Sequence, residues 1–512
     1  MNVEKAPGAM ATSAVLACLG AASGLLYWTL VSISLDPALG IVHGMRDATC
    51  TGPLTWPARF LRVTGTGPEM AHAAYIAIIV LLSGLWFAGI HIVKRERGHA
   101  ATAVIACGFA VFATLLVLAP VFQSSDIFNY VFGGRAMSVY RSNPYTLLPS
   151  MRPHDPFYGL IRWKDAASVY GPIFSYLSCL LTRIAGNSVT ANVICFKVMA
   201  ALSYAACLPL VYHLARRVSP GRENQALMIG AWCPLLLLHI PGGAHNDMTA
   251  ATLVLGGYLL YRKGYLLWGL ALVALALDVK LTAGLALVPL FVLYIRDRCG
   301  VPLNRLALGS LTCAAAVAVP YAGLWRGSRT FESTGKVASL YSASSVPDLF
   351  RQPLERALTA KGVSPATADT IARGSIRLVF LVVFLVGAFV LLRRVTDFGS
   401  MARAAAALAL LWLLTSTYVL PWYATLGVML VSFSAWNLTT VMTLGAATVL
   451  LLYRLPLSGE PGGGATLYIA LPLLLIAAGW ALLGALTRAT RARSAFNGTD
   501  GRRIAPSAPG GG

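Results

Sequence analysis

The chain has 512 residues, of which 57% are hydrophobic and only 12% are charged, and its mean hydropathy is +0.69. This composition excludes a soluble globular protein, which could not bury so much apolar surface. The formal net charge is +21, but the basic residues form short clusters between apolar runs, which argues against a nucleic-acid-binding face. Nine cysteines without C-x-x-C spacing argue against a zinc site or a disulfide scaffold.

Uncharged segments follow one another along the chain, and a membrane-spanning helix needs about 20 such residues. The predicted fold class is therefore all-α, a polytopic membrane protein with about 13 to 14 transmembrane helices. The first run has no cleavage site followed by a soluble domain, so it reads as a helix or uncleaved anchor. The predicted helices span residues 11–34, 71–93, 100–122, 188–213, 226–240, 247–262, 265–279, 280–295, 306–324, 375–392, 404–420, 422–436, 438–453 and 467–487.

Clusters of Lys and Arg predict which ends of these helices face the cytoplasm. The clusters occupy residues 94–97, 216–222, 262–263, 296–298, 393–394 and 488–493. If all six are cytoplasmic, the apolar runs between them come in pairs, and both chain ends lie inside. We expect residues 1–493 to form one transmembrane domain. The small, polar residues 494–512 then form a disordered cytoplasmic tail.

One apolar run, residues 172–181, is only about half as long as a membrane is thick. We interpret it as a re-entrant or interfacial helix, because a spanning helix there would turn every later basic cluster outward. Two long loops, at about residues 123–187 and 325–374, then lie outside. The polar turns at 241–247, 277–280 and 418–423 share that side, so we expect the working face to be the periplasmic or extracellular one.

Asp126 is the first carboxylate after the third helix. Partial desolvation at the membrane surface can bring a carboxyl group toward the range of a general base. Apolar residues recur at helical spacing from Ile127 to Tyr140, which predicts an amphipathic helix lying in the membrane surface. The alternative is that Asp126 only caps this helix.

A polar turn, "AHNDMTA", stands at the mouth of the next pair of helices. His245, Asn246 and Asp247 could bind the hydroxyls of a sugar, or they could cap the following helix. Consecutive side chains point in different directions, so we predict no metal site here. Further on, Asp278 and Lys280 interrupt an uncharged stretch. Lys280 could meet a phosphate group, or the two residues could simply mark a polar turn.

Aromatic residues accompany prolines in "YGP" and "PWY". Tyr170, Trp422 and Tyr423 could form a carbohydrate-stacking or lipid-gating edge, although membrane proteins commonly carry aromatic belts at both interfaces. Positive charges in the outer loop 325–374 indicate an anionic ligand such as a phosphate. Arg135 is a further cation available on the outer side.

In this order, "DIFNYVFGGRAMSVYRSNPY", "YGP", "GGAHNDMTA", "DVKLTAGLALVPL" and "PWY" resemble motifs of the GT-C superfamily of integral-membrane glycosyltransferases. Within it the chain is most similar to bacterial polyprenyl-phosphate-mannose-dependent alpha-1,6-mannosyltransferases. The resemblance covers roughly residues 100–440. Two extra helices precede the aspartate here, whereas many relatives place it straight after the first helix.

The resemblance implies an inverting transferase that moves a hexose, with mannose as the expected one. The donor would be a polyprenyl-phosphate sugar and the acceptor a glycan or lipid-linked saccharide, with no cofactor. Asp126 would be the catalytic base. The expected substrate-binding residues are Arg135, Tyr170, His245, Asn246, Asp247, Lys280, Trp422 and Tyr423. A secondary transporter or lipid-linked-sugar flippase is the alternative, but it would favour inverted repeats and charges in mid-helix.

The predicted topology can be tested by cysteine labelling in intact cells. A Ser142→Cys variant should react with a membrane-impermeant reagent, because the 123–187 loop is expected outside. A matched Ser219→Cys variant, inside the second basic cluster, should react only after permeabilisation. The reverse pattern would invert the topology.

Overall fold

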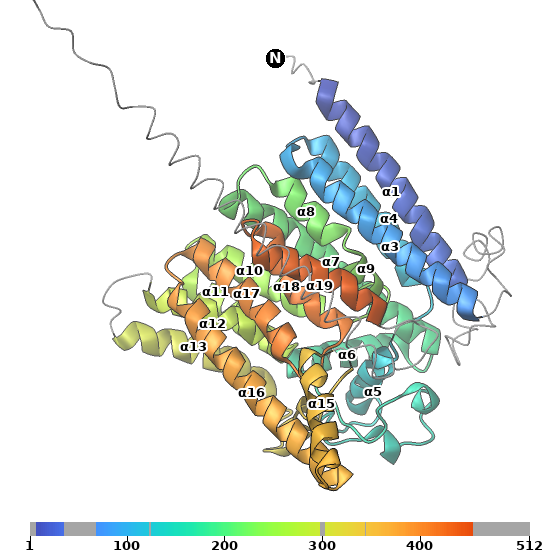
Figure 1. Cartoon of the computed structure of the whole chain (residues 1–512), viewed down its shortest axis with the longest axis vertical. Helices are drawn as coiled ribbons and strands as arrows, with labels where there is room; N and C mark the ends of the chain where they lie inside the picture. Colours follow the sequence, from blue (N-terminus) through green and yellow to red (C-terminus); the bar gives the residue numbers. More distant parts are fainter. Residues whose placement is uncertain (1–6, 35–67, 122–123, 297–302, 344, 454–512) are drawn as a thin grey trace, which may run out of the picture.

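The computed structural model describes residues 7–34, 68–121, 124–296, 303–343 and 345–453. Within these ranges every regular element is a helix, apart from an isolated bridge between Arg326 and Ser328. The predicted all-α, polytopic fold class is confirmed. Among the described residues, seven helices are long and apolar enough to cross a membrane (Figure 1): α1 (Pro7–Ser34), α3 (Pro68–Ile92), α4 (His99–Leu118), α7 (Val189–Val218), α13 (Leu303–Tyr321), α16 (Pro365–Arg393) and α17 (Phe398–Thr415).

The other predicted helices are shorter. They are α8 (Glu223–Ala231), α9 (Pro234–His239), α10 (Asp247–Arg262), α11 (Leu266–Leu275), α12 (Gly284–Arg296), α18 (Thr425–Phe433) and α19 (Leu438–Tyr453). The predicted helix 467–487 and the tail 494–512 lie outside the described residues.

The helix predicted for residues 226–240 is interrupted. It ends at Ala231 and resumes at Pro234, because a proline has no N–H to donate and its ring clashes with the preceding turn. The indole Nε1 of Trp232 donates to the carbonyl of Ile105 at 2.8 Å, which ties the break to α4. The turn predicted at 277–280 is present as two 3-10 segments, η7 (Ala276–Asp278) and η8 (Leu281–Ala283).

The helix that begins at Asp126, α5 (Asp126–Ser138), is not the surface helix that its sequence suggests. Its buried residues lie on all sides, and together with α6 (Pro172–Ala185) they form a separate hydrophobic cluster. A Cβ on Gly134 would come within 2.4 Å of the carbonyl oxygen of Ser178, so the second glycine of the "GG" pair allows α5 and α6 to pack closely. At 14 residues, α6 is about 21 Å long, too short to span, as predicted.

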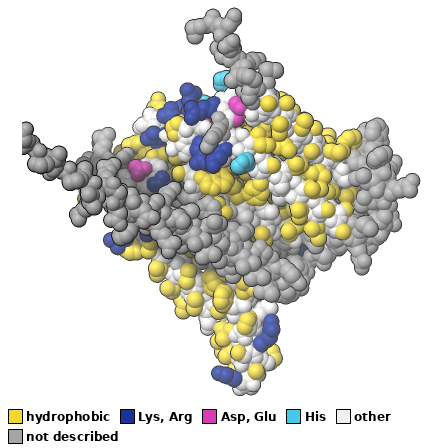
Figure 2. Space-filling model, turned by 45° about the horizontal axis from the view of Figure 1, so that its top comes forward, with side chains coloured by type: hydrophobic (Ala, Val, Ile, Leu, Met, Phe, Trp, Pro, Cys, Tyr) yellow, Lys and Arg dark blue, Asp and Glu magenta, His cyan; other side chains and the backbone are white. Residues whose placement is uncertain are grey.

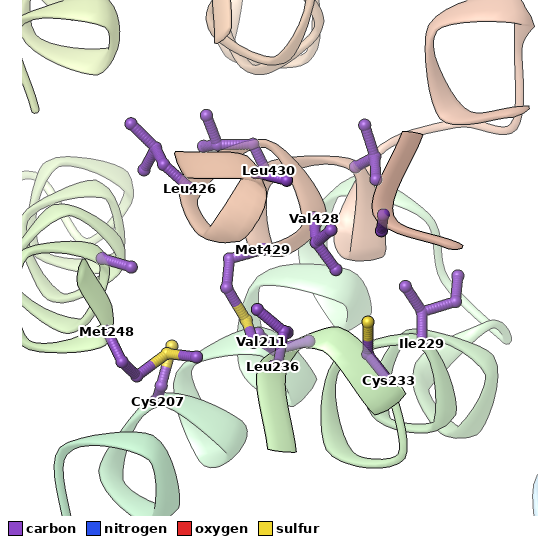
Figure 3. Packing of buried hydrophobic residues seen from close by; sticks show 14 of the residues in the cluster. Cys207, Val211, Ile229, Cys233, Leu236, Met248, Leu426, Val428, Met429 and Leu430 are labelled. Carbon is purple, nitrogen blue, oxygen red and sulfur yellow. The ribbon is translucent and has the colours of Figure 1, made fainter. Parts of the chain in front are cut away.

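The larger hydrophobic core extends from α1 to α19, and Figure 3 shows the part of it where α7, α8, α9, α10 and α18 meet. Met429 of α18 and Leu236 of α9 are buried there, close to Cys207 and Cys233. Both cysteines are free thiols. They pack as small hydrophobic residues, as their positions in apolar runs predict.

Basic clusters that are distant in sequence lie side by side. The side-chain amide of Asn224 donates to the carbonyl oxygens of Glu96 and Gly98, which joins the first two clusters. Arg296 donates to the carbonyl oxygens of Arg393 and Val395, which joins two later clusters. Figure 2 shows many Lys and Arg side chains gathered at one end, separated by a hydrophobic middle from a few at the opposite tip. This pattern is typical of a membrane protein whose clusters share one side.

The segment "YGP" crosses directly over the η7 turn. A Cβ on Gly171 would lie 2.2 Å from the carbonyl oxygen of Asp278, far inside contact distance. Only glycine therefore allows the two backbones to approach this closely. The crossing brings the backbone segments that carry Tyr170 and Lys280 together, and both residues line one cavity.

We therefore expect Gly171→Ala to force the two segments apart and to lower the free energy of unfolding by about 1 to 3 kcal/mol. Thermal unfolding of the purified protein in detergent would measure this loss. Gly159→Ala is the matched control, because a Cβ there would meet nothing within 4 Å. Equal stability of the two variants would contradict the close approach.

Candidate active site

A cavity of about 550 Å³ lies between α5, the loop that ends in Tyr170, η8, α14 (Glu332–Ala338), α16, α17 and η10 (Pro421–Ala424). It is lined by segments that lie between Ser125 and Tyr423, at opposite ends of much of the chain. Five of the nine predicted site residues line it: Asp126, Tyr170, Lys280, Trp422 and Tyr423. The fold thus brings the outer motifs of the sequence into one chamber.

Asp126 is the first residue of α5 and lies half-buried on the cavity wall. The N-cap position is Ser125, which makes no capping hydrogen bond with its side chain, whereas the hydroxyl of Ser124 accepts the backbone N–H of Asp126 at 3.3 Å. Asp126 therefore follows the N-cap position and does not occupy it, unlike the capping alternative. A carboxylate in the first turn is stabilised by the helix dipole, and here it faces open space where a substrate could bind.

Lys280 forms an ion pair with Asp247, the first residue of α10. Its Nζ lies 2.7 Å and 2.6 Å from the two carboxylate oxygens. The same ammonium lies 4.8 Å from the centre of the Tyr423 ring, which favours a cation–π contact. Asp247 thus fixes the position of Lys280 and lies behind it, rather than in the lining of the cavity.

His245 is fully buried and stacks on Trp422, with ring centres 3.6 Å apart and planes at 17°. Its Nδ1 shares a hydrogen bond of 3.0 Å with the hydroxyl of Tyr130. His245 therefore supports a wall residue from behind and does not itself line the cavity. The neighbouring Asn246 is also fully buried, and among the described residues its amide nitrogen and oxygen have no hydrogen-bond partner.

Arg135 lies apart from the cavity. Its guanidinium pairs with Asp155 at 2.9 Å, donates to Asn187 at 2.9 Å, and lies 4.9 Å from the centre of the Phe157 ring. The pair is almost completely buried, so Arg135 holds the outer loop together. We therefore leave it out of the proposed substrate site.

Tyr170 carries a polar group on the cavity wall. Burial of its ring raises the pKa of its hydroxyl, and the nearby charge of Asp126 raises this pKa further. The phenol thus stays protonated at neutral pH and can donate a hydrogen bond. No group of three or more potential metal-ligating His, Cys, Asp or Glu residues occurs in the part of the chain that the structure describes.

Sequence reasoning missed three residues of this site. Tyr130, one helical turn after Asp126, holds His245 and packs edge-on against Tyr170 at 4.9 Å between ring centres. Arg162 and Arg377 line the cavity. The helical spacing from Asp126 could have indicated Tyr130, whereas neither arginine belongs to a motif of the sequence.

The long apolar helices define a multi-pass membrane protein. Its cavity is lined by the carboxylate of Asp126, by Lys280 and by several aromatic residues, as in an enzyme that binds a polar substrate. Residues 37–296 match the family described as "Alpha-(1->6)-mannopyranosyltransferase, N-terminal domain". This match covers half of the chain and includes Asp126, Asp247 and Lys280. The chain belongs to the alpha-(1->6)-mannopyranosyltransferase family, and the resemblance seen in its sequence is confirmed.

Individual relatives match a shorter part. Alpha-(1->6)-mannopyranosyltransferase A of Mycobacterium tuberculosis is 31% identical over 192 residues, 37% of this chain and 37% of the relative. The A protein of Corynebacterium glutamicum is 29% identical over 180 residues, 35% and 36% of the two chains. The B protein of the same organism is 29% identical over 159 residues, 30% and 25% of the two chains. The matched part thus spans between 25% and 37% of the length of these relatives.

The hydrogen bond between Tyr130 and His245 can be tested directly. Tyr130→Phe keeps the ring but leaves the buried Nδ1 without this partner, so we expect the free energy of unfolding to fall by about 1 to 3 kcal/mol. Thermal unfolding would report the change. Tyr176→Phe is the control, because that hydroxyl makes only an exposed bond of 3.3 Å to Pro320. A smaller loss at Tyr130 than at Tyr176 would contradict the supporting role.

Proposed function

We propose that this protein transfers a mannosyl residue from a polyprenyl-phosphate donor to a hydroxyl group of a glycan or lipid-linked acceptor. The family supports the sugar and the transfer, because its relatives are named as alpha-(1->6)-mannopyranosyltransferases. The single observation that carries the proposal is the cavity itself. It combines the carboxylate of Asp126, the cation of Lys280 and aromatic walls in one chamber.

In this reaction Asp126 accepts the proton of the acceptor hydroxyl. The acceptor oxygen then attacks the anomeric carbon of the donor sugar, and the bond from that carbon to the phosphate oxygen breaks. The products are a new glycosidic bond and the free lipid phosphate, with the proton held on Asp126. A single displacement of this kind inverts the anomeric centre. Positive side chains beside the departing phosphate stabilise its growing charge.

The lipid part of the donor has a path to the cavity along α16. Phe380, Leu381 and Phe384 of α16 line the chamber, and Leu381 is also 50% exposed. The cavity therefore extends to the outer surface of α16, where none of residues 375–392 is buried. A polyprenyl chain could lie on this apolar wall while its head group is inside. This arrangement supports a lipid-linked donor over a water-soluble nucleotide sugar.

The side of the membrane follows from charge. Basic clusters that lie next to one another mark the cytoplasmic end under the positive-inside rule, and Asp126 begins the loop that this rule puts outside. We therefore place the reaction on the periplasmic or extracellular side. The protein's partners in this setting are membrane lipids, the lipid-linked donor and the acceptor.

The transporter or flippase alternative would use an interrupted helix near a binding site. The break between α8 and α9 is such an interruption. However, Trp232 and Cys233 at this break are buried in the apolar core and do not line the cavity. Membranes incubated with radiolabelled polyprenyl-phosphate mannose, and separately with the glucose analogue, distinguish the two functions. Label in a saccharide indicates transfer, whereas label that remains on the lipid but changes sides indicates transport.

Asp126→Asn tests the proposed base. Asparagine keeps the shape of the side chain but cannot accept the proton, so transfer should fall by about 10² to 10⁴-fold while the protein stays folded. Incorporation of radiolabelled mannose by purified protein would measure this. Asp165→Asn, which changes an exposed carboxylate of the same loop, should leave transfer unchanged. Near-normal transfer by Asp126→Asn would remove Asp126 from the mechanism.

A further inference from the structure

The cavity contains an arginine whose charge is not balanced by a carboxylate. Arg377 of α16 lines the chamber and is half-buried. Its Nη2 donates to the carbonyl oxygen of Ser339 at 2.8 Å, and its guanidinium lies 5.6 Å from the centre of the Tyr341 ring. Within the described ranges it forms no ion pair, and its buried Nε has no hydrogen-bond partner.

The two arginines nearest to Arg377 in this part of the fold, Arg373 and Arg351, are both balanced by carboxylates. Arg373, one turn before Arg377, pairs with Asp369 at 2.7 Å. Arg351 of α15 (Val346–Ala360) pairs with Asp348, Glu355 and Asp369. The ion pairs between α15 and the start of α16 therefore end one helical turn before Arg377, and no carboxylate in the described residues balances its charge.

The other two cations of the cavity differ from Arg377. Lys280 is already balanced by both oxygens of Asp247. Arg162 is exposed, with its guanidinium 5.8 Å from the centre of the Trp163 ring. A half-buried, unbalanced guanidinium attracts an anion more strongly than either, because less solvent screens it and no carboxylate competes.

Arg377 also stands at the head of an apolar strip. Phe380, Leu381 and Phe384 follow it at helical spacing and line the same cavity. It is the last charged residue before the uncharged run 378–392, which places its guanidinium at the boundary of the membrane. An anionic head joined to a long apolar chain would fit this arrangement.

Building on the proposed function, we propose that Arg377 binds the phosphate of the polyprenyl donor, and that the balanced Lys280–Asp247 pair is not its main anchor. Arginine suits this task, since its planar fork can bind two phosphate oxygens at once. The carbonyl oxygen of Ser339 and the ring of Tyr341 contact the guanidinium and limit its movement.

Binding of undecaprenyl phosphate and of uncharged undecaprenol to the purified full-length protein tests this without any sugar transfer. Wild-type protein should prefer the phosphate. Arg377→Gln and Arg377→Met should each reduce that preference by about 10 to 100-fold, the range for losing a hydrogen bond to a charged group. Arg326→Gln changes an exposed arginine of the outer loop 325–374 that does not line the cavity, so it is the control and should keep the preference.

The outcomes separate the two proposals. If wild-type protein shows no preference for the phosphate, the proposed lipid-phosphate donor is wrong, and the role of Arg377 is overturned with it. If wild type prefers the phosphate, but Lys280→Gln loses this preference and the Arg377 variants keep it, only the role of Arg377 is overturned. Thermal unfolding of each variant confirms that it is folded. Arg377→Lys keeps the charge but loses the planar guanidinium, so its preference for undecaprenyl phosphate should lie between those of wild type and Arg377→Gln.

Discussion

The ion pair between Asp247 and Lys280 is the contact on which the rest of the cavity depends. It joins the start of α10 to the turn between η7 and η8, and Gly171 lets the Tyr170 segment cross that same turn. The ammonium group of Lys280 also lies over the ring of Tyr423, which positions the η10 segment against the same turn. Two opposite charges with side chains only 12% and 6% exposed tolerate this environment only as a pair. Their geometry therefore fixes the positions of three separate loops.

The sequence alone predicted the parts of this arrangement that obey local rules. Long uncharged runs identified the spanning helices, and polar residues at their ends identified Asp126, Tyr170, Lys280, Trp422 and Tyr423, which the cavity does bring together. Both signals arise because a charge or a break in an apolar helix is costly. Such costs are visible at a single position, without knowledge of what packs against it.

What the sequence could not predict depends on contacts between distant segments. Arg135 and Arg377 look alike in the sequence, as single arginines near helix ends. Only the fold places Asp155 beside the first and leaves the second facing the cavity. In the same way, α5 has the pattern of a surface helix, but α6 covers its exposed side. Hydrophobic periodicity reports which side chains are apolar, not whether lipid or protein surrounds them.

Charge balance explains why an unbalanced cation at the cavity edge suits the proposed chemistry. In that reaction Asp126 gains a proton and loses its negative charge, while the lipid phosphate gains one as its bond to the sugar breaks. The total charge is unchanged, but negative charge moves from the base toward the phosphate. A cation helps only if it interacts more strongly with the transition state than with the bound donor. A guanidinium held in place by Ser339 and Tyr341 meets this condition at the phosphate without having to reorganise. Lys280 is held by Asp247, so much of its field is cancelled before the charge moves.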